Sequence, residues 1–186
     1  MRVFDAATGE PLQSLFAFDR EFTGGVRVAA GDLNGDGRAE VITAAGSGDG
    51  PHVRAFDAAT AAVMRDFFAY DLNFNGGVYV TAEDLDGDGI DEIVTGAGAG
   101  GASHVVAFDG ETLDRLYSSF AFEPTFAGGV RVAAADLNGD GRAEIVAATG
   151  PRGGAEVRTL SPFADIMFDL HGLNSFFAYA SCPRRS

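Results

Sequence analysis

The sequence predicts an all-β fold made of propeller blades, and three observations carry that prediction. The chain of 186 residues repeats with a period of 52, because the acidic stretch that starts at Asp32 returns at Asp84 and at Asp136. Each period contains four short segments with the alternating or β-branched pattern of strands. No segment sustains the 3.6-residue apolar period of an amphipathic helix. Periods of this size are typical of propellers, solenoids and other repeat arrays.

One complete unit indicates where the strands lie. "VRVAA" (26–30) alternates, "EVITAA" (40–45) is a continuous apolar run, and "HVRAFD" (52–57) alternates again. "VMRDFFAY" (63–70) completes the unit. Short connections between these segments favour antiparallel pairing in sequence order, so each unit is predicted to be a propeller blade of four antiparallel strands.

The same period divides the chain into about three and a half blades. The division is a half blade at 1–22, blades at 23–74, 75–126 and 127–180, and a tail at 181–186. Closed propellers have about four to eight blades. We therefore expect a partial propeller, which either belongs to a longer chain or is completed by self-association.

Aromatic residues recur at the end of each predicted fourth strand. We expect most of their side chains to fill the core between blades, with an aromatic ligand surface as the alternative. These residues are Phe16, Phe18, Phe68, Tyr70, Phe120 and Phe122.

The acidic loop has the pattern of a calcium site. In the first copy Asp32, Asn34, Asp36, Arg38 and Glu40 hold positions 1, 3, 5, 7 and 9. Alternate side chains of a tight loop turn inward, so the oxygens of positions 1, 3 and 5 converge, position 7 offers its carbonyl and position 9 closes the cage. A glycine at position 6 permits the positive φ that such a loop needs. Oxygen donors without His or Cys select calcium over zinc or copper.

Two alternatives were weighed for this loop. An EF-hand starts in the same way but needs a bidentate Glu at position 12, where this chain has Thr43, Thr95 and Ala147. A plain turn also favours Asp, Asn and Gly. A plain turn needs no acid at position 9, however, whereas all three copies have one, and unneutralised carboxylates would repel one another.

Composition limits the classes of partner. The formal net charge of -14 argues against nucleic acid and anionic membranes, and favours cations. Cys182 is the single cysteine, so no disulfide forms within the chain. The amino terminus lacks the pattern of an export signal, and no run of 18 apolar residues predicts a membrane span.

Several motifs point to other chemistry and are set aside. "GAGAGG" (96–101) fits a dinucleotide-binding pattern, but a strand rather than a helix is predicted to follow it. His52 and His104 lie one period apart, hence on different blades, and are interpreted as first residues of strands instead of zinc ligands; His171 is isolated. Every conspicuous acid belongs to a threefold set, whereas catalysis usually needs one asymmetric site. We therefore expect no enzyme activity.

With these features in place, the unit "GGVRVAAGDLNGDGRAEVITAAGSGDGPHVRAFD" resembles the FG-GAP repeat, also called VCBS, which forms the blades of integrin α-subunit-like propellers. The resemblance implies a seven-bladed propeller at an extracellular or cell-surface location, with about three calcium sites. The ligands that it implies are Asp32, Asn34, Asp36, the Arg38 carbonyl and Glu40; Asp84, Asp86, Asp88, the Ile90 carbonyl and Glu92; and Asp136, Asn138, Asp140, the Arg142 carbonyl and Glu144.

Three functions remain open from the sequence. The first is a calcium-binding extracellular interaction module that presents a propeller surface to an unidentified protein or glycan. The second is a carbohydrate-binding, lectin-like propeller with pockets near Phe22, Phe74 and Phe126. The third is a non-catalytic accessory segment of a larger secreted enzyme.

Overall fold

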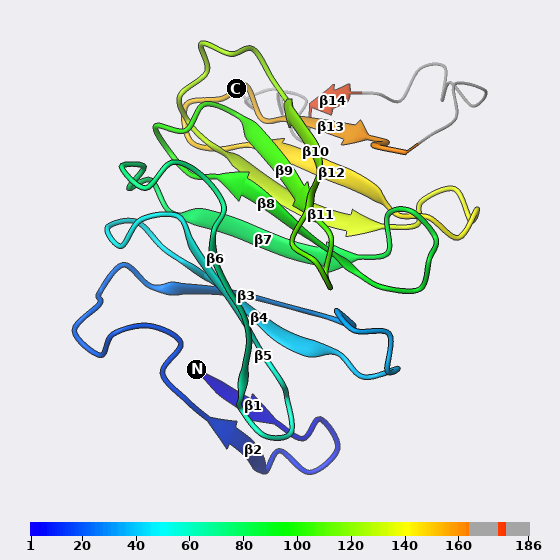
Figure 1. Ribbon diagram of the computed structural model, residues 1–186. Coiled ribbons are helices and arrows are strands. Elements are labelled where there is room, and N and C mark those ends of the chain that lie inside the picture. Colours follow the sequence, from blue (N-terminus) through cyan, green and yellow to red (C-terminus); the bar gives the residue numbers. More distant parts are fainter. Residues whose placement is uncertain (164–174, 178–186) are drawn as a thin grey trace, which may run out of the picture.

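The computed structural model describes residues 1–163 and 175–177. In this part of the chain every regular element is a β-strand, and no helix occurs (Figure 1). The predicted all-β class is therefore confirmed. The interpretations of His171, Cys182 and the tail at 181–186 concern residues outside the described ranges.

The strands form one hairpin and three four-stranded sheets, each pairing in sequence order. The hairpin pairs β1 (Arg2–Phe4) with β2 (Pro11–Ser14). The first blade contains β3 (Val26–Gly31), β4 (Glu40–Ala45), β5 (His52–Phe56) and β6 (Val63–Phe68). The second blade contains β7 (Val78–Glu83), β8 (Glu92–Ala97), β9 (His104–Phe108) and β10 (Arg115–Phe120). The third blade contains β11 (Val130–Ala135), β12 (Glu144–Thr149), β13 (Glu156–Leu160) and β14 (Ser175–Phe177).

All strand pairs within the blades are antiparallel, as the sequence predicts. The sheets stack face to face in chain order from the hairpin to the third blade (Figure 1). The first strands of the blades lie next to one another, with β7 between β3 and β11. This arrangement is a stack of partial β-propeller blades.

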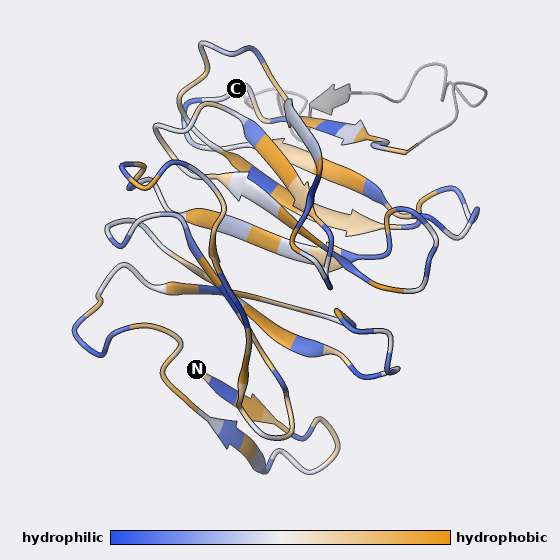
Figure 2. Cartoon of the chain, in the orientation of Figure 1, coloured by the Kyte–Doolittle hydropathy of each residue, from blue (hydrophilic) through white to orange (hydrophobic). Residues whose placement is uncertain are grey.

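Stacking decides which strands are buried on both faces. All six residues of β8 are buried, because the second blade is covered by its neighbours on both sides. A strand buried on both faces has no need to alternate, which explains why apolar residues of β8 occupy both faces of the sheet. The outer strand β10 alternates between half-buried and exposed residues at one edge of the sheet. Apolar residues accordingly concentrate in the strands, and many loop residues are polar (Figure 2).

Two cores hold the complete blades together. Ile42 and Val53 of the first blade pack with Val78 and Ile93 of the second, and all four side chains are fully buried. The next core joins the second blade to the third through a corresponding set that includes Val94, Val105, Val130 and Ile145. Burial of such side chains is the main favourable term in folding.

The prediction for the aromatic residues is wrong for half of them. Phe18 and Phe122 are buried in the cores between sheets, but Phe16, Phe68 and Phe120 are 62%, 49% and 49% exposed. Phe68 and Phe120 are the last residues of β6 and β10, the outer strands of their sheets. The chain bends directly after them, so the residues two positions later turn under the adjacent blade and the first aromatic of each pair stays at the rim.

One face of the first blade differs from its counterparts. Val26 and Val28 of β3 are 42% and 59% exposed, whereas the equivalent Val78 and Val80 of β7 are buried. Val78 and Val80 pack on the complete sheet of the first blade. Before β3, the described chain offers only the two-stranded hairpin, which leaves these two valines uncovered.

Candidate metal centres

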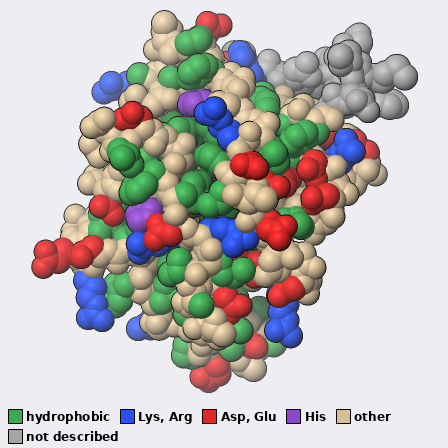
Figure 3. Space-filling model, in the orientation of Figure 1, with side chains coloured by type: hydrophobic (Ala, Val, Ile, Leu, Met, Phe, Trp, Pro, Cys, Tyr) green, Lys and Arg blue, Asp and Glu red, His purple; other side chains and the backbone are tan. Residues whose placement is uncertain are grey.

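The three acidic loops connect the first strand of each blade to the second, and we call them the first (32–40), second (84–92) and third (136–144) acidic loops. They lie on the same side of the stack (Figure 1), and acidic side chains gather there on the surface (Figure 3). The flanking segments are strands, which agrees with the rejection of an EF-hand.

The position 1 carboxylate organises each loop. Asp32 accepts the N–H of Gly35 at 2.8 Å through Oδ1 and the N–H of Gly37 at 2.7 Å through Oδ2. Gly35 and Gly37 have φ values of 72° and 83°, so the predicted need for glycine at position 6 is confirmed and extends to position 4. Burial opposes ionisation of Asp32, but the backbone N–H groups outweigh it and lower its pKa. Asp84 and Asp136 accept the equivalent N–H groups in their loops.

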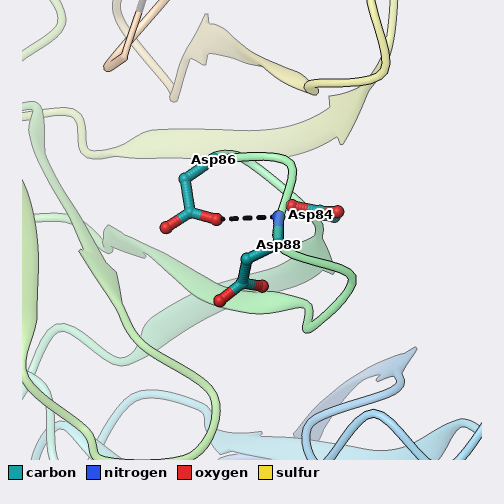
Figure 4. Close-up of side chains that lie close together, drawn as sticks. All are labelled: Asp84, Asp86 and Asp88. Atoms are coloured by element: carbon teal, nitrogen blue, oxygen red, sulfur yellow. Dashed lines mark hydrogen bonds between the residues drawn. The ribbon is translucent and has the colours of Figure 1, made fainter.

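Positions 3 and 5 each use one oxygen to fix the loop backbone. In the second loop, Asp86 accepts the N–H of Asp88 at 3.1 Å (Figure 4). Asp88 accepts the N–H of Ile90 at 2.8 Å. Asn34 and Asp36 repeat this pattern, as do Asn138 and Asp140. Each of these side chains has a further oxygen or lone pair for another partner.

The acid at position 9 is buried in all three copies. Glu40, Glu92 and Glu144 are 2%, 1% and 5% exposed. Each accepts the N–H of the leucine at position 2 through Oε2, at distances of 2.8, 2.7 and 2.9 Å. A plain surface turn does not require a buried carboxylate, and a buried charge is costly unless it is paired. The position 9 acids therefore weigh against the plain-turn alternative.

The second loop brings its carboxylates closest together. One oxygen each from Asp84, Asp86 and Asp88 lies within 4.8 Å of the others (Figure 4). Burial and the nearby Asp88 raise the pKa of Asp86. Glu92 is not part of this cluster, because its carboxylate turns inward to Leu85. Burial, together with repulsion from the three aspartates, raises the pKa of Glu92 to about 7.

The third loop holds its acids together in another way. The Asn138 side-chain nitrogen donates to Glu144 Oε1 at 2.8 Å and to Asp140 Oδ2 at 3.0 Å. One donor group thus bridges two carboxylates at positions 5 and 9. All side-chain donors in the three loops are carboxylate or amide oxygens, the donor type that Ca²⁺ prefers. By this test of donor chemistry, the loops fit the calcium that the resemblance implies.

The residues at position 7 link successive loops. The side chain of Arg142 lies over Gly87 of the second loop, where a Cβ placed on Gly87 would be 3.2 Å from the Arg142 Nε atom. Ile90 lies in the same way over Gly35 of the first loop, at 3.5 Å. The first loop therefore has an apolar neighbour and the second a cationic one.

The motifs that the sequence analysis set aside lie where it predicted. His52 and His104 are the first residues of β5 and β9, and their rings contact Asp66 and Ser118 on the adjacent strands. The "GAGAGG" stretch leads from β8 towards β9, with no helix following it in the described residues. Neither motif forms the site that its pattern alone suggests.

A pocket of about 670 Å³ lies between the first and second blades beside Phe74, one of the three residues near which the lectin-like alternative expected pockets. Sequence reasoning missed how the lining of this pocket differs from the other repeats. Its lining includes Tyr70, Phe74, Val106 and Arg115. Two of these residues break the repeat, because the first unit has Arg54 and Val63 at the positions of Val106 and Arg115. These two differences between the units are visible in the sequence, whereas the contacts of the residues are visible only in the structure.

No helix that could cross a membrane is found in the described part of the chain. A search of curated proteins found no match to the sequence. Among solved structures, the exotype rhamnogalacturonan lyase YesX is similar with a TM-score of 0.48 and 17% sequence identity, over 84% of this chain. The chain covers 32% of that lyase, about a third of its length.

Family comparison gives a direct match in two segments. Residues 24–64 match the FG-GAP repeat family, and residues 84–147 match the family of FG-GAP-like repeats. The first segment includes most of the first blade, and the second runs from the second acidic loop into β12. Both matched segments contain an acidic loop and strands of the four-stranded sheets described above. The chain belongs to the FG-GAP repeat family.

Proposed function

We propose that this FG-GAP repeat chain is a calcium-stabilised extracellular interaction module, in which each acidic loop binds one Ca²⁺ ion and the blades present a surface to a protein or a glycan. The observation that carries the proposal is the buried acid at position 9, held by the same hydrogen bond in all three loops. FG-GAP repeats are typical of extracellular proteins, which supports the location.

The residues that would hold the ion are the oxygens of positions 1, 3, 5 and 9 and the carbonyl of position 7 in each loop. Bound calcium supplies positive charge that neutralises the clustered carboxylates. The chain's own part is to preorganise the donors. Position 1 fixes the loop through two glycine N–H groups, and position 9 is anchored at the start of the second strand. Ion binding would then join the ends of the first two strands of each blade.

A non-catalytic role is part of this proposal. The acidic residues recur in three equivalent loops on three blades, which suits repeated structural sites better than a single reaction centre. An accessory segment of a larger secreted enzyme is compatible with the same arrangement. The interaction surface would then serve to position that enzyme on its target.

The exposed side chains of Val26 and Val28 are evidence that the stack of blades has a further binding partner. Val26 and Val28 occupy the positions at which Val78 and Val80 bury themselves against a preceding sheet. We infer that another blade, from a longer chain or from a second copy, covers this face. Light scattering of the unmodified chain and of a variant with Val26→Ser and Val28→Ser distinguishes the two sources. If a second copy covers this face, the unmodified chain forms an oligomer and the substitutions dissociate it.

Thermal unfolding tests the calcium proposal. Extracellular calcium modules bind with Kd values of about 10⁻⁴ to 10⁻³ M. At calcium concentrations of 10 to 100 times Kd, each site is expected to stabilise the fold by about 1.4 to 2.7 kcal/mol. EGTA should lower the melting temperature, and Asp36→Ala, Asp88→Ala and Asp140→Ala together should abolish the effect of calcium.

A second triple variant controls for net charge. Glu10, Glu21 and Glu111 are exposed and lie outside the acidic loops, so changing all three to Ala removes the same charge without touching a proposed ligand. This control should keep the full calcium response. If chelation leaves the melting temperature of the unmodified chain unchanged, the acidic loops are turns that bind no ion.

A further inference from the structure

The pocket between the first and second blades lacks an arginine that is present at the equivalent position of the two neighbouring junctions. At the junction of the hairpin with the first blade, the Arg54 Nη1 atom donates to the Ala17 carbonyl at 3.0 Å. At the junction of the second and third blades, Arg158 donates to the Ala121 carbonyl, also at 3.0 Å. The residue one period from both arginines is Val106.

The absence of the arginine leaves an aromatic ring and a backbone carbonyl of the pocket without the contact that their counterparts make at the other two junctions. Arg54 and Arg158 lie over the rings of Phe18 and Phe122, at 5.9 and 5.2 Å from the ring centres. The corresponding ring between the first and second blades is Tyr70, and the corresponding carbonyl is that of Ala69. Both residues line the pocket. With Val106 in place, no arginine among the described residues covers this ring or donates to this carbonyl.

The aromatic wall of the pocket is held in position. The Tyr70 hydroxyl lies 3.1 Å from both Thr95 Oγ1 and the His104 carbonyl oxygen. The ring packs edge-on against Phe74 at 5.7 Å. Phe68 and Phe108 add two further aromatic rings to the lining. Such fixed apolar surface with a few polar groups is typical of small-molecule sites, and about 670 Å³ is within their usual range.

The adjacent strand β10 contributes a cationic side chain, Arg115, to the same pocket. Arg115 lines the pocket, whereas the preceding unit has Val63 at that position. None of the ion pairs among the described residues involves Arg115, although the chain carries a net charge of -14. The acid that pairs with Arg54 is Asp66, and its counterpart in the second blade is the neutral Ser118. The pocket therefore has a guanidinium in place of an internal ion pair, and its lining carboxylate, Asp71, accepts hydrogen bonds from Asn73 instead of pairing with Arg115.

We propose that this pocket binds the ring of an acidic sugar, with the carboxylate on Arg115, a hydroxyl on the Ala69 carbonyl and the apolar face of the ring on Tyr70 and Phe74. Guanidinium groups pair with carboxylates through charge-assisted hydrogen bonds. A ring with both hydroxyls and an apolar face satisfies the remaining groups. His104 is part of the pocket wall. This inference gives the glycan branch of the proposed function a site, and it does not depend on calcium occupying the loops.

NMR titration of the intact chain tests the proposal with sodium D-glucuronate and D-galacturonate, against D-glucose and D-galactose as neutral probes and acetate as a carboxylate without a ring. At least one uronate should bind at least about tenfold more tightly than its neutral counterpart, which is the difference expected for one charge-assisted hydrogen bond. An oligogalacturonide arm separates recognition of a polymer from that of a free sugar acid. Equal binding of neutral sugars, or no uronate binding at millimolar concentration, overturns the proposal.

The repeat supplies matched variants. Val106→Arg restores the residue of the sister junctions and should abolish uronate binding, and Arg115→Val restores the residue of the first unit and should reduce it to the level of the neutral sugars. Arg54→Val opens the equivalent space beside Ala17 without adding a cation, so it should add no uronate site. Undiminished binding in Val106→Arg would refute the location. A cooperative thermal unfolding transition shows that each variant folds, whether or not the melting temperature depends on calcium, so the outcome stays separate from that of the calcium proposal.

Discussion

The backbone N–H of Asp91 donates to the carbonyl of Asp32 at 2.8 Å, and the Asp91 carboxylate accepts the N–H of Asp32 at the same distance. Position 8 of the second loop is thereby joined to position 1 of the first loop by two reciprocal hydrogen bonds. Between the second and third loops, Ala143 makes the backbone bond to Asp84 without a side-chain partner. Each proposed calcium site is thus attached directly to the next one.

This link predicts the effect of Asp91→Ala. The substitution keeps the backbone bond that Ala143 makes naturally, but it leaves the Asp32 N–H without its acceptor. We expect a loss of about 1 to 3 kcal/mol in the free energy of unfolding, the usual cost of an unpaired, partly buried donor. Urea unfolding in calcium measures it. Asp91→Asn keeps an acceptor and removes the charge, so equal losses in the two variants would contradict the hydrogen-bond explanation.

Arg142 is expected to weaken calcium binding at the second loop. Its side chain lies over Gly87, and its charge favours the ionised form of Asp86, which partly offsets burial and the repulsion of Asp88. Because a cation near the site repels the ion, Arg142→Ile should tighten binding by about two- to tenfold. Calcium titration in an Asp36→Ala, Asp140→Ala background reports on the second loop alone. Arg142→Lys should leave the affinity nearly unchanged, and an unaltered Kd in Arg142→Ile would refute the electrostatic effect.

The buried Glu92 gives the metal-free chain a characteristic pH dependence. Burial raises its pKa to about 7, so the folded state holds the proton more tightly than the unfolded chain. Its contribution to stability is fully present below the ordinary pKa of 4.5 and is lost as the pH rises through about 7. The loss is at most roughly 3 kcal/mol. Unfolding in EGTA across this range should show a steeper decline in the unmodified chain than in Glu92→Gln, while the exposed Glu111→Gln should behave like the unmodified chain.

Much of this architecture could be predicted from the sequence because each blade repeats the same local rules. Alternation and β-branched runs located β3 to β6, and the spacing of Asp32, Asp36 and Glu40 identified the first acidic loop. These features depend on residues close in sequence. The exposure of Phe68 was not predictable in this way, because it depends on how the chain bends from one blade under the next.

The sequence analysis expected a pocket near Phe74 but missed its distinctive lining for a related reason. Val106 looks like an ordinary strand residue, and only the contacts of Arg54 and Arg158 with carbonyls of the preceding sheet reveal what the valine leaves open. Differences between repeats carried that information, whereas the period itself emphasised what the repeats share.

The recurring glycines of the motif yield a last prediction, which concerns close approach of two backbone segments. A Cβ on Gly98 would lie 2.0 Å from the carbonyl oxygen of Gly76, and the same contact recurs between Gly46 and Gly24 at 1.8 Å. Because backbone atoms cannot move aside cheaply, Gly98→Ala should destabilise the chain by more than about 3 kcal/mol. Gly100 has open space at its Cβ and a φ of 92°. Gly100→Ala should therefore cost only the conformational strain, about 1 to 2 kcal/mol. Chemical unfolding of both variants provides the comparison, and a Gly98→Ala chain as stable as Gly100→Ala would show that the two segments separate more readily than their packing implies.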